Sequence, residues 1–241
     1  MGKSKDLATG ETRFVNTAGD TMTGDLQSTE LVANNAGNNT NIRVQNTASG
    51  SGSSDGFVIQ NATNSKVYLW NYENSDVLFG TNSIERLKID ASGRVTMPTQ
   101  AYGEAEGLYG SSTSVSSGSI INWLTANHLN GGVTFSNNGR FTVPTAGRYL
   151  VHYRLYFYPN SPVSQYYQIS LQKNGSEEDF MIDEENMTTY SGSGKLDRGL
   201  SFTTVIRLAA SDYLELKYLG SATANFYRGG PHNKFKVLLL S

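Results

Sequence analysis

The sequence GRFTVPTAGRYLVHY at residues 139–153 decides the fold class of the C-terminal part of the chain. Hydrophobic and polar residues alternate in it, with the period of two that places one side of a strand in a core and the other in solvent. The alternation continues in ISLQKNG (169–175), LSFTTVIRLAASDYLELKYLG (200–220) and NKFKVLLLS (233–241). The sequence therefore predicts an antiparallel β domain at the C-terminal end.

The order of these segments resembles the globular head of complement-subcomponent and tumour-necrosis-factor-like proteins. The matching residues are Phe141, Pro144, Gly147, Tyr149 and Tyr153, with Lys173, Asn174 and Gly175 at a turn. One departure is the sequence PTAG at residues 144–147, where two residues separate the proline from the glycine; in animal heads the glycine more often follows the proline directly. The resemblance implies a jelly roll of two antiparallel sheets, assembly as a trimer and ligand binding through exposed loops. It does not identify a ligand, because one fold serves many functions.

The composition sets limits on the class of protein. Only 17% of the 241 residues are charged, against about 25% in an average chain, and the net charge is −2. Because no basic surface is available to neutralise phosphates, nucleic-acid binding is disfavoured. No apolar run approaches the roughly 20 residues of a membrane-spanning helix, and the first residues lack the apolar core of a signal peptide. We expect a chain made in the cytoplasm and rich in short, solvated strands.

Near the N-terminus, the segment GDTMTGDL resembles an element that recurs in tail fibre and tail collar proteins of tailed bacteriophages. Six residues carry this match: Gly19, Asp20, Met22, Thr23, Gly24 and Leu26. Glycines on both sides of a lone methionine suggest a tight turn that exposes a small apolar knob to a partner. The resemblance implies that residues 1–27 attach the chain to other tail proteins. From the residues alone, a flexible polar linker is the alternative.

Residues 54–98 resemble shaft segments of phage tail fibres. The residues that match are Tyr68, Trp70, Asn71, Phe79, Gly80, Thr81, Glu85, Arg86, Ile89, Asp90, Gly93 and Val95. Without the resemblance, Asp90-Ala91-Ser92-Gly93 between two short apolar segments is typical of a hairpin turn, in which Gly93 supplies a positive φ.

The middle region has few large apolar side chains, above all in residues 34–55. Each ordered residue costs about 1–2 kcal/mol of backbone entropy, so one chain cannot bury enough apolar surface there. We therefore expect three intertwined copies, an assembly that supplies the missing core. The side chains expected on the shared axis are Ile42, Val44, Phe57, Ile59, Leu69 and Phe79.

No catalytic or metal-binding pattern stands out in the sequence. The acidic run at residues 177–186 lacks the ligand spacing and central glycine of a calcium loop, which favours a solvated loop. His128, His152 and His232 are far apart in the sequence and lack metal-type spacing, and nothing points to a serine triad. Depolymerase tailspikes resemble β-helices much longer than this shaft. We expect no enzymatic activity, no cofactor and no metal.

Tyrosines in the head exceed what a period-two core would use, in residues 154–168 and 225–232. Tyrosine presents a flat apolar face with a hydroxyl at its edge, which suits stacking on sugar rings. The alternative is that half or more of these side chains pack inside the jelly roll or at subunit contacts. The candidate receptor-binding residues, all expected in loops, are Tyr158, Asn160, Tyr190, Tyr227 and Arg228.

Together these features predict an all-β chain with three parts: an attachment segment at 1–27, an intertwined trimeric shaft at 28–100 and a jelly-roll head at 101–241. The main hypothesis is a homotrimeric phage tail fibre in the virion, bound to tail proteins at one end and to a bacterial polysaccharide or outer-membrane protein at the other. One alternative is a purely structural virion fibre or tail-decorating protein whose head drives trimerisation. A carbohydrate-degrading tailspike, or a free carbohydrate-binding or hydrolytic module, is a further alternative.

Overall fold

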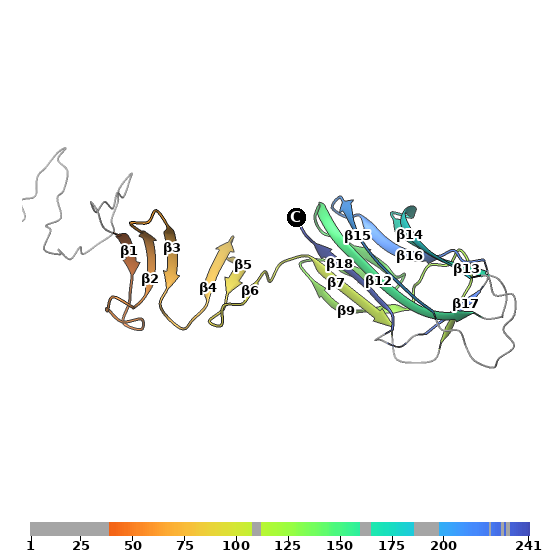
Figure 1. The fold of residues 1–241 in the computed structure, drawn as a ribbon, viewed down its shortest axis with the longest axis horizontal. Helices are drawn as coiled ribbons and strands as arrows, with labels where there is room; N and C mark the ends of the chain where they lie inside the picture. Colours follow the sequence, from red (N-terminus) through yellow and green to blue (C-terminus); the bar gives the residue numbers. More distant parts are fainter. Residues whose placement is uncertain are drawn as a thin grey trace, which may run out of the picture. The chain divides into compact units, whose positions relative to one another are not determined.

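The computed structural model describes residues 39–107, 112–159, 165–185, 198–221, 223–227, 229 and 232–241. Every strand pairing in these residues is antiparallel and no helix is among their elements, which confirms the all-β prediction (Figure 1). Accordingly, none of the described residues forms a helix long and apolar enough to cross a membrane. The chain divides into two compact units, Met1–Asn74 and Ser75–Ser241. The candidate attachment residues Gly19, Asp20, Met22, Thr23, Gly24 and Leu26 lie outside the described residues.

The first unit contains a three-stranded sheet of β1 (Thr40–Val44), β2 (Phe57–Asn61) and β3 (Val67–Asn71). Ile42 pairs with Ile59, and Ile59 pairs with Leu69, so aliphatic side chains form a row across all three strands. These three side chains are 38%, 42% and 55% exposed. The strands form their hydrogen-bond ladders within one chain, and none of the described residues covers this face. We call the row Ile42, Ile59 and Leu69, with its neighbours Val44, Phe57 and Val67, the aliphatic face.

A second small sheet consists of β4 (Val77–Thr81), β5 (Ile84–Ile89) and β6 (Val95–Thr96). The predicted turn joins β5 to β6: Gly93 has a φ of +81°, and its amide donates to the Asp90 carbonyl oxygen at 2.8 Å. The Asp90 carboxylate accepts from Arg94 Nε at 2.7 Å, which closes the turn. Phe79 is 41% exposed, so this sheet also leaves apolar side chains uncovered.

The head is a sandwich of two antiparallel sheets. The seven-stranded sheet has the order β8 (Thr113–Val115), β17 (Ala224–Phe226), β12 (Gly147–Pro159), β18 (Lys234–Leu239), β7 (Tyr102–Gly107) and β9 (Leu124–Asn130), with β15 (Arg198–Leu208) also paired to β12. The five-stranded sheet has the order β10 (Thr134–Ser136), β11 (Arg140–Thr142), β16 (Tyr213–Tyr218), β13 (Gln165–Lys173) and β14 (Ser176–Glu185). The long strand β12 runs through the middle of the first sheet (Figure 1).

The core lies between these sheets, and alternate residues of β12 supply much of it. Tyr149, Val151, Tyr153, Leu155 and Phe157 are each 0% exposed, as the period-two pattern predicts. The other half of the strand therefore faces away from the core.

Phe141 of β11 extends the core toward the edge of the sandwich. Its ring centroid lies 4.6 Å from that of Phe135 and 4.9 Å from that of Phe235. A Cβ at Gly103 would lie 2.5 Å from the Phe141 ring, so the glycine of β7 makes room for this aromatic group.

The predicted turn after residue 173 is confirmed. Asn174 and Gly175 have φ values of +52° and +81° and join β13 to β14. The Asn174 side chain donates to Asp212 Oδ1 at 2.8 Å and accepts from the Tyr213 amide at 2.9 Å. This turn is thereby tied to the start of β16 as well.

A charged cluster occupies the outer face of the seven-stranded sheet around Glu104, which is 8% exposed. Its carboxylate accepts from Tyr102 Oη at 2.6 Å, from Lys234 Nζ at 2.7 Å and from Lys236 Nζ at 3.0 Å. Burial pushes the pKa of Glu104 up, but these donors more than compensate and lower it from 4.5 to about 2. The ionised carboxylate thus stabilises the pairing of β7 with β18.

Replacing this carboxylate, Glu104→Gln, is expected to lower the free energy of unfolding by about 1–2 kcal/mol near neutral pH. Because the folded pKa is depressed, the stabilisation is complete above pH 4.5 and is lost as the pH falls toward about 2. The difference in free energy of unfolding between wild type and variant, measured by urea unfolding, should therefore become smaller as the pH falls over this range.

The matched control is Glu178→Gln, at an exposed position on the same head, which should change stability little at any pH. A gap between wild type and Glu104→Gln that is the same at neutral and at strongly acidic pH would contradict the role given to Glu104.

Candidate functional site

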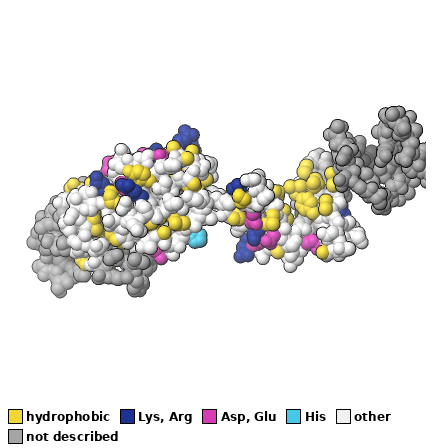
Figure 2. All heavy atoms as spheres, turned by 180° about the vertical axis from the view of Figure 1, so that it is seen from behind, with side chains coloured by type: hydrophobic (Ala, Val, Ile, Leu, Met, Phe, Trp, Pro, Cys, Tyr) yellow, Lys and Arg dark blue, Asp and Glu magenta, His cyan; other side chains and the backbone are white. Residues whose placement is uncertain are grey.

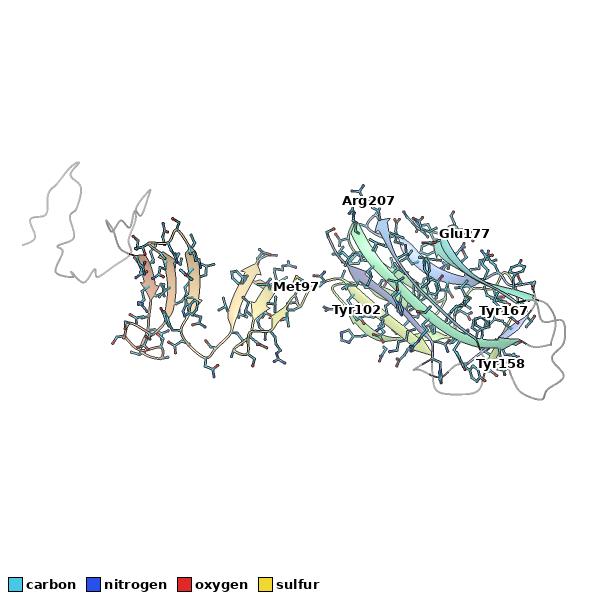
Figure 3. The ribbon with its side chains drawn as sticks, in the orientation of Figure 1. Met97, Tyr102, Tyr158, Tyr167, Glu177 and Arg207 are labelled. Atoms are coloured by element: carbon cyan, nitrogen blue, oxygen red, sulfur yellow. The ribbon has the colours of Figure 1, made fainter. Side chains whose placement is uncertain are left out.

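Two of the predicted receptor-binding residues, Tyr158 and Tyr227, lie in contact although they are far apart in the sequence. Their ring centroids are 5.1 Å apart. The contact follows from strand pairing, because β17 runs antiparallel to the end of β12 with Tyr158 opposite Asn225. Figure 3 shows Tyr158 near the C-terminal end of β12, at the opposite end of the head from Tyr102. Sequence reasoning placed Tyr158 in a loop, and this expectation is wrong, since it lies within β12.

Two further aromatic residues join this pair. The Tyr156 ring lies 5.0 Å from Tyr227, and His232 stacks on Tyr156 at 5.2 Å with an interplanar angle of 24°. We call Tyr156, Tyr158, Tyr227 and His232 the aromatic cluster. The three tyrosines are half-buried and His232 is exposed, so the cluster has a solvent-facing side.

The core beneath holds the cluster in place. Phe157, between the two tyrosines of β12, points inward and packs on Phe226 at 5.2 Å and on Tyr167 at 4.8 Å. Because side chains alternate along a strand, the inward position of Phe157 fixes Tyr156 and Tyr158 on the outer face. Phe226, also buried, is the last residue of β17 and so fixes the position of Tyr227, which follows it.

Asn233 links the two segments that carry the cluster. It is 0% exposed, its Oδ1 accepts from the Tyr156 amide at 2.7 Å, and its Nδ2 donates to the Tyr227 carbonyl oxygen. The Tyr227 amide also donates to the Tyr156 carbonyl oxygen at 2.9 Å. Asn233 is thus a positioning residue, and sequence reasoning missed it because the sequence alone does not show that it is buried.

The chemistry of the cluster is that of a binding surface. Flat rings offer apolar faces, while tyrosine hydroxyls and the imidazole offer hydrogen bonds at their edges. The Tyr158 hydroxyl is 2.6 Å from Ser112 Oγ, which orients one of these edges. Among the described residues, no three His, Asp or Glu side chains gather in a way that could hold a metal ion.

Three other predicted binding residues, Asn160, Tyr190 and Arg228, lie outside the described residues. The other two histidines lie apart from the cluster. His152 Nδ1 is 2.9 Å from Thr203 Oγ1, and burial, with Lys236 and Arg154 nearby, lowers its pKa. The His128 ring lies 5.6 Å from that of Tyr102.

Comparison with known proteins supports the fold alone. No protein-family model matches the chain, and none of the curated proteins matches it. Solved structures do match, among them Eiger TNF from S. frugiperda, with a TM-score of 0.50 and 12% identity over 59% of this chain and 94% of that chain. The head has a tumour-necrosis-factor-like jelly-roll fold. The resemblance seen in the sequence is confirmed in this respect, and the ligand stays open because such a fold serves many functions.

Replacing the positioning residue, Asn233→Ala, is expected to lower the free energy of unfolding by about 2–4 kcal/mol. The change leaves the Tyr156 amide and the Tyr227 carbonyl without their side-chain partner in a buried place. Urea unfolding measures the loss. The matched control Asn138→Ala, in an exposed turn of the same head, should stay within about 0.5 kcal/mol of wild type. Equal effects of the two changes would show that Asn233 does not hold the segments together.

Proposed function

We propose that this chain is a homotrimeric tail-fibre protein of a tailed bacteriophage, which attaches the virion to the bacterial surface through its head. The observation that carries the proposal is the aromatic cluster. Two tyrosines singled out from the sequence as receptor-binding candidates are in contact, with Tyr156 and His232 beside them. A partly exposed aromatic surface at one end of a β-sandwich suits the recognition of a partner.

The ligand class that best fits the cluster is a bacterial surface polysaccharide. Sugar rings present C–H faces to aromatic rings and hydroxyls to polar edges, and the cluster offers both kinds of partner. Recognition of a single unit can be weak, because several linked sites that bind together raise avidity by roughly 10²–10⁴. The mechanism is mechanical and multivalent, with no turnover and no cofactor.

The homotrimer is supported by the uncovered apolar surfaces outside the head. Apart from Val67, the residues of the aliphatic face of β1–β3 are, together with Phe79 of β4, those expected from the sequence to meet on a shared axis. A three-stranded sheet needs a covered hydrophobic face to be stable. Three copies related by one axis would cover these faces with each other, and a closed symmetric assembly avoids further growth.

The remaining parts of the proposal rest on the sequence. Residues 1–27 would bind tail proteins of the virion, residues 28–100 would form the shaft and residues 101–241 the head. The fibre would therefore act in the virion tail, after synthesis in the host cytoplasm.

The receptor role is tested with the fluorescently labelled full chain on a panel of bacterial strains that differ in surface polysaccharide. Saturable binding to at least one strain is expected. The double variant Tyr158→Ala with Tyr227→Ala should bind at least about tenfold more weakly, a loss of about 1.4 kcal/mol or more.

The matched control for the receptor test is Tyr213→Ala. Tyr213 is also half-buried, but it lies beside Arg140, away from the cluster. This variant should bind as wild type does. Absence of saturable binding on every strain, or undiminished binding by the double variant, would refute the receptor role.

The trimer is tested by Ile59→Asp, at the centre of the aliphatic face. Wild type should have three times the chain mass of 26.2 kDa in light scattering. A carboxylate at position 59 would be buried without a partner in the trimer, so the variant should dissociate into single chains. Ser53→Asp, at an exposed loop position of the same unit, should remain trimeric. A wild-type mass of one chain, or an unchanged mass for Ile59→Asp, would refute this assembly.

A further inference from the structure

A second row of aromatic side chains lies outside the head, on β3 and just after it. The ring centroids of Tyr68 and Trp70 are 6.1 Å apart, and those of Trp70 and Tyr72 are also 6.1 Å apart. These residues are spaced two apart, so they share one side of the sheet, opposite the aliphatic face. We call them the aromatic row.

The aromatic row borders a shallow hollow. Val58, Gln60, Tyr68, Trp70 and Tyr72 line it, with a volume of about 200 Å³. Val58 is 2% exposed and forms its floor, whereas Trp70 and Tyr72 are 50% and 42% exposed. Figure 2 shows hydrophobic side chains gathered over this small sheet.

Polar groups surround the hollow and are already oriented. Gln60 Nε2 donates to Asn41 Oδ1 at 2.7 Å. Arg43 lies 5.4 Å from the centre of the Tyr72 ring and donates to the Asp55 carbonyl oxygen at 2.8 Å. This side of the sheet therefore combines fixed rings with fixed amide and guanidinium groups.

The two sides of this sheet differ in chemistry. Apart from the Phe57 ring, the aliphatic face carries branched aliphatic side chains, and such apolar groups suit packing against protein. The strand positions of the other side are Asn41, Arg43, Val58, Gln60, Tyr68 and Trp70, of which only Arg43 is charged. Flat rings interleaved with amides suit a ligand with apolar faces and many hydroxyls.

We propose that the aromatic row is a second carbohydrate-binding site, which takes a neutral, extended polysaccharide chain. The rings follow one another along a strand, so they fit successive units of a linear polymer better than a compact molecule. The single charged side chain, itself engaged by Tyr72 and Asp55, favours an uncharged polymer. This site is separate from the aromatic cluster and goes beyond the function proposed for the head.

The chain offers a direct reporter for this site, because it has only two tryptophans. Trp123 packs on Phe226 in the head, and its indole nitrogen is buried without a hydrogen-bond partner among the described residues. Trp123→Phe therefore removes no described hydrogen bond and leaves Trp70 as the only tryptophan. Its fluorescence then reports on the hollow alone.

The test measures acrylamide quenching of Trp70 in the full-length Trp123→Phe protein, with dextran, mannan or galactan added as neutral probes. Without polysaccharide, Trp70 should be readily quenched. At least one probe should protect it saturably and lower the quenching constant at least threefold. Affinity electrophoresis in gels that contain the protecting polymer gives a second measurement, with the substitutions made in the wild-type chain. The polymer should retard the Trp70→Ala variant less than it retards wild type. Val67→Ala, on the opposite face of β3, should leave the retardation unchanged.

Two outcomes would overturn the proposal. One is that none of the three polymers protects Trp70. The other is a joint result: Trp70 resists quenching without any polymer, and Trp70→Ala changes the mass of the assembly in light scattering. That result would show that another copy of the chain covers this side. The double variant Tyr158→Ala with Tyr227→Ala, made in the Trp123→Phe protein, separates the two sites: protection of Trp70 should persist in it even if the head loses its receptor.

Discussion

The burial of alternate side chains of β12 between the two sheets is the constraint on which the head depends. Five large side chains, from Tyr149 to Phe157, have no exposed surface. Each contributes about 1.5–3 kcal/mol of transfer free energy when fully buried, so the register of this strand is strongly fixed. A slip by one residue would bury Arg148, His152 and Arg154 and would move Tyr156 and Tyr158 inside. The position of the aromatic cluster on the outer face is therefore a consequence of the core.

Much of the head could be predicted from the sequence because its signals are local. Period-two alternation predicted the strands, and the turn at Asn174-Gly175, expected from the resemblance, occurs at two residues that accept a positive φ. The cluster was only partly predictable, because the contact of Tyr158 with Tyr227 depends on the pairing of β12 with a strand distant in the sequence. Asn233 carried no signal, because it reads as a loop amide, and nothing in residues 154–168 distinguished Tyr156 from the other tyrosines of that segment.

The segment VYLWN of β3 shows a different limit of sequence reasoning. It has no alternation between apolar and polar residues, a pattern typical of a strand buried on both faces. In the chain by itself, however, Val67, Leu69 and Trp70 are each at least half exposed. The pattern thus predicts that both faces of the strand are covered, and the described residues of one chain do not cover them. The two faces differ enough, aliphatic on one and aromatic on the other, for one strand to have a different partner on each side.

The arrangement of strands also decides how the head would bear a mechanical load. The head begins with β7, which pairs with the last strand β18, and Leu239 donates to the Ala101 carbonyl oxygen at 2.9 Å. Leu238 of β18 pairs with Tyr102 of β7 on one side and with Leu150 of β12 on the other, so Tyr102 and Leu150 lie at the same level of the sheet. Tyr158 lies eight residues farther along β12, which is about 26 Å at the rise of a strand. Tension between Ala101 and the aromatic cluster would then run parallel to the strands. It would shear the β7 ladders, loading their hydrogen bonds together, instead of unzipping them one by one.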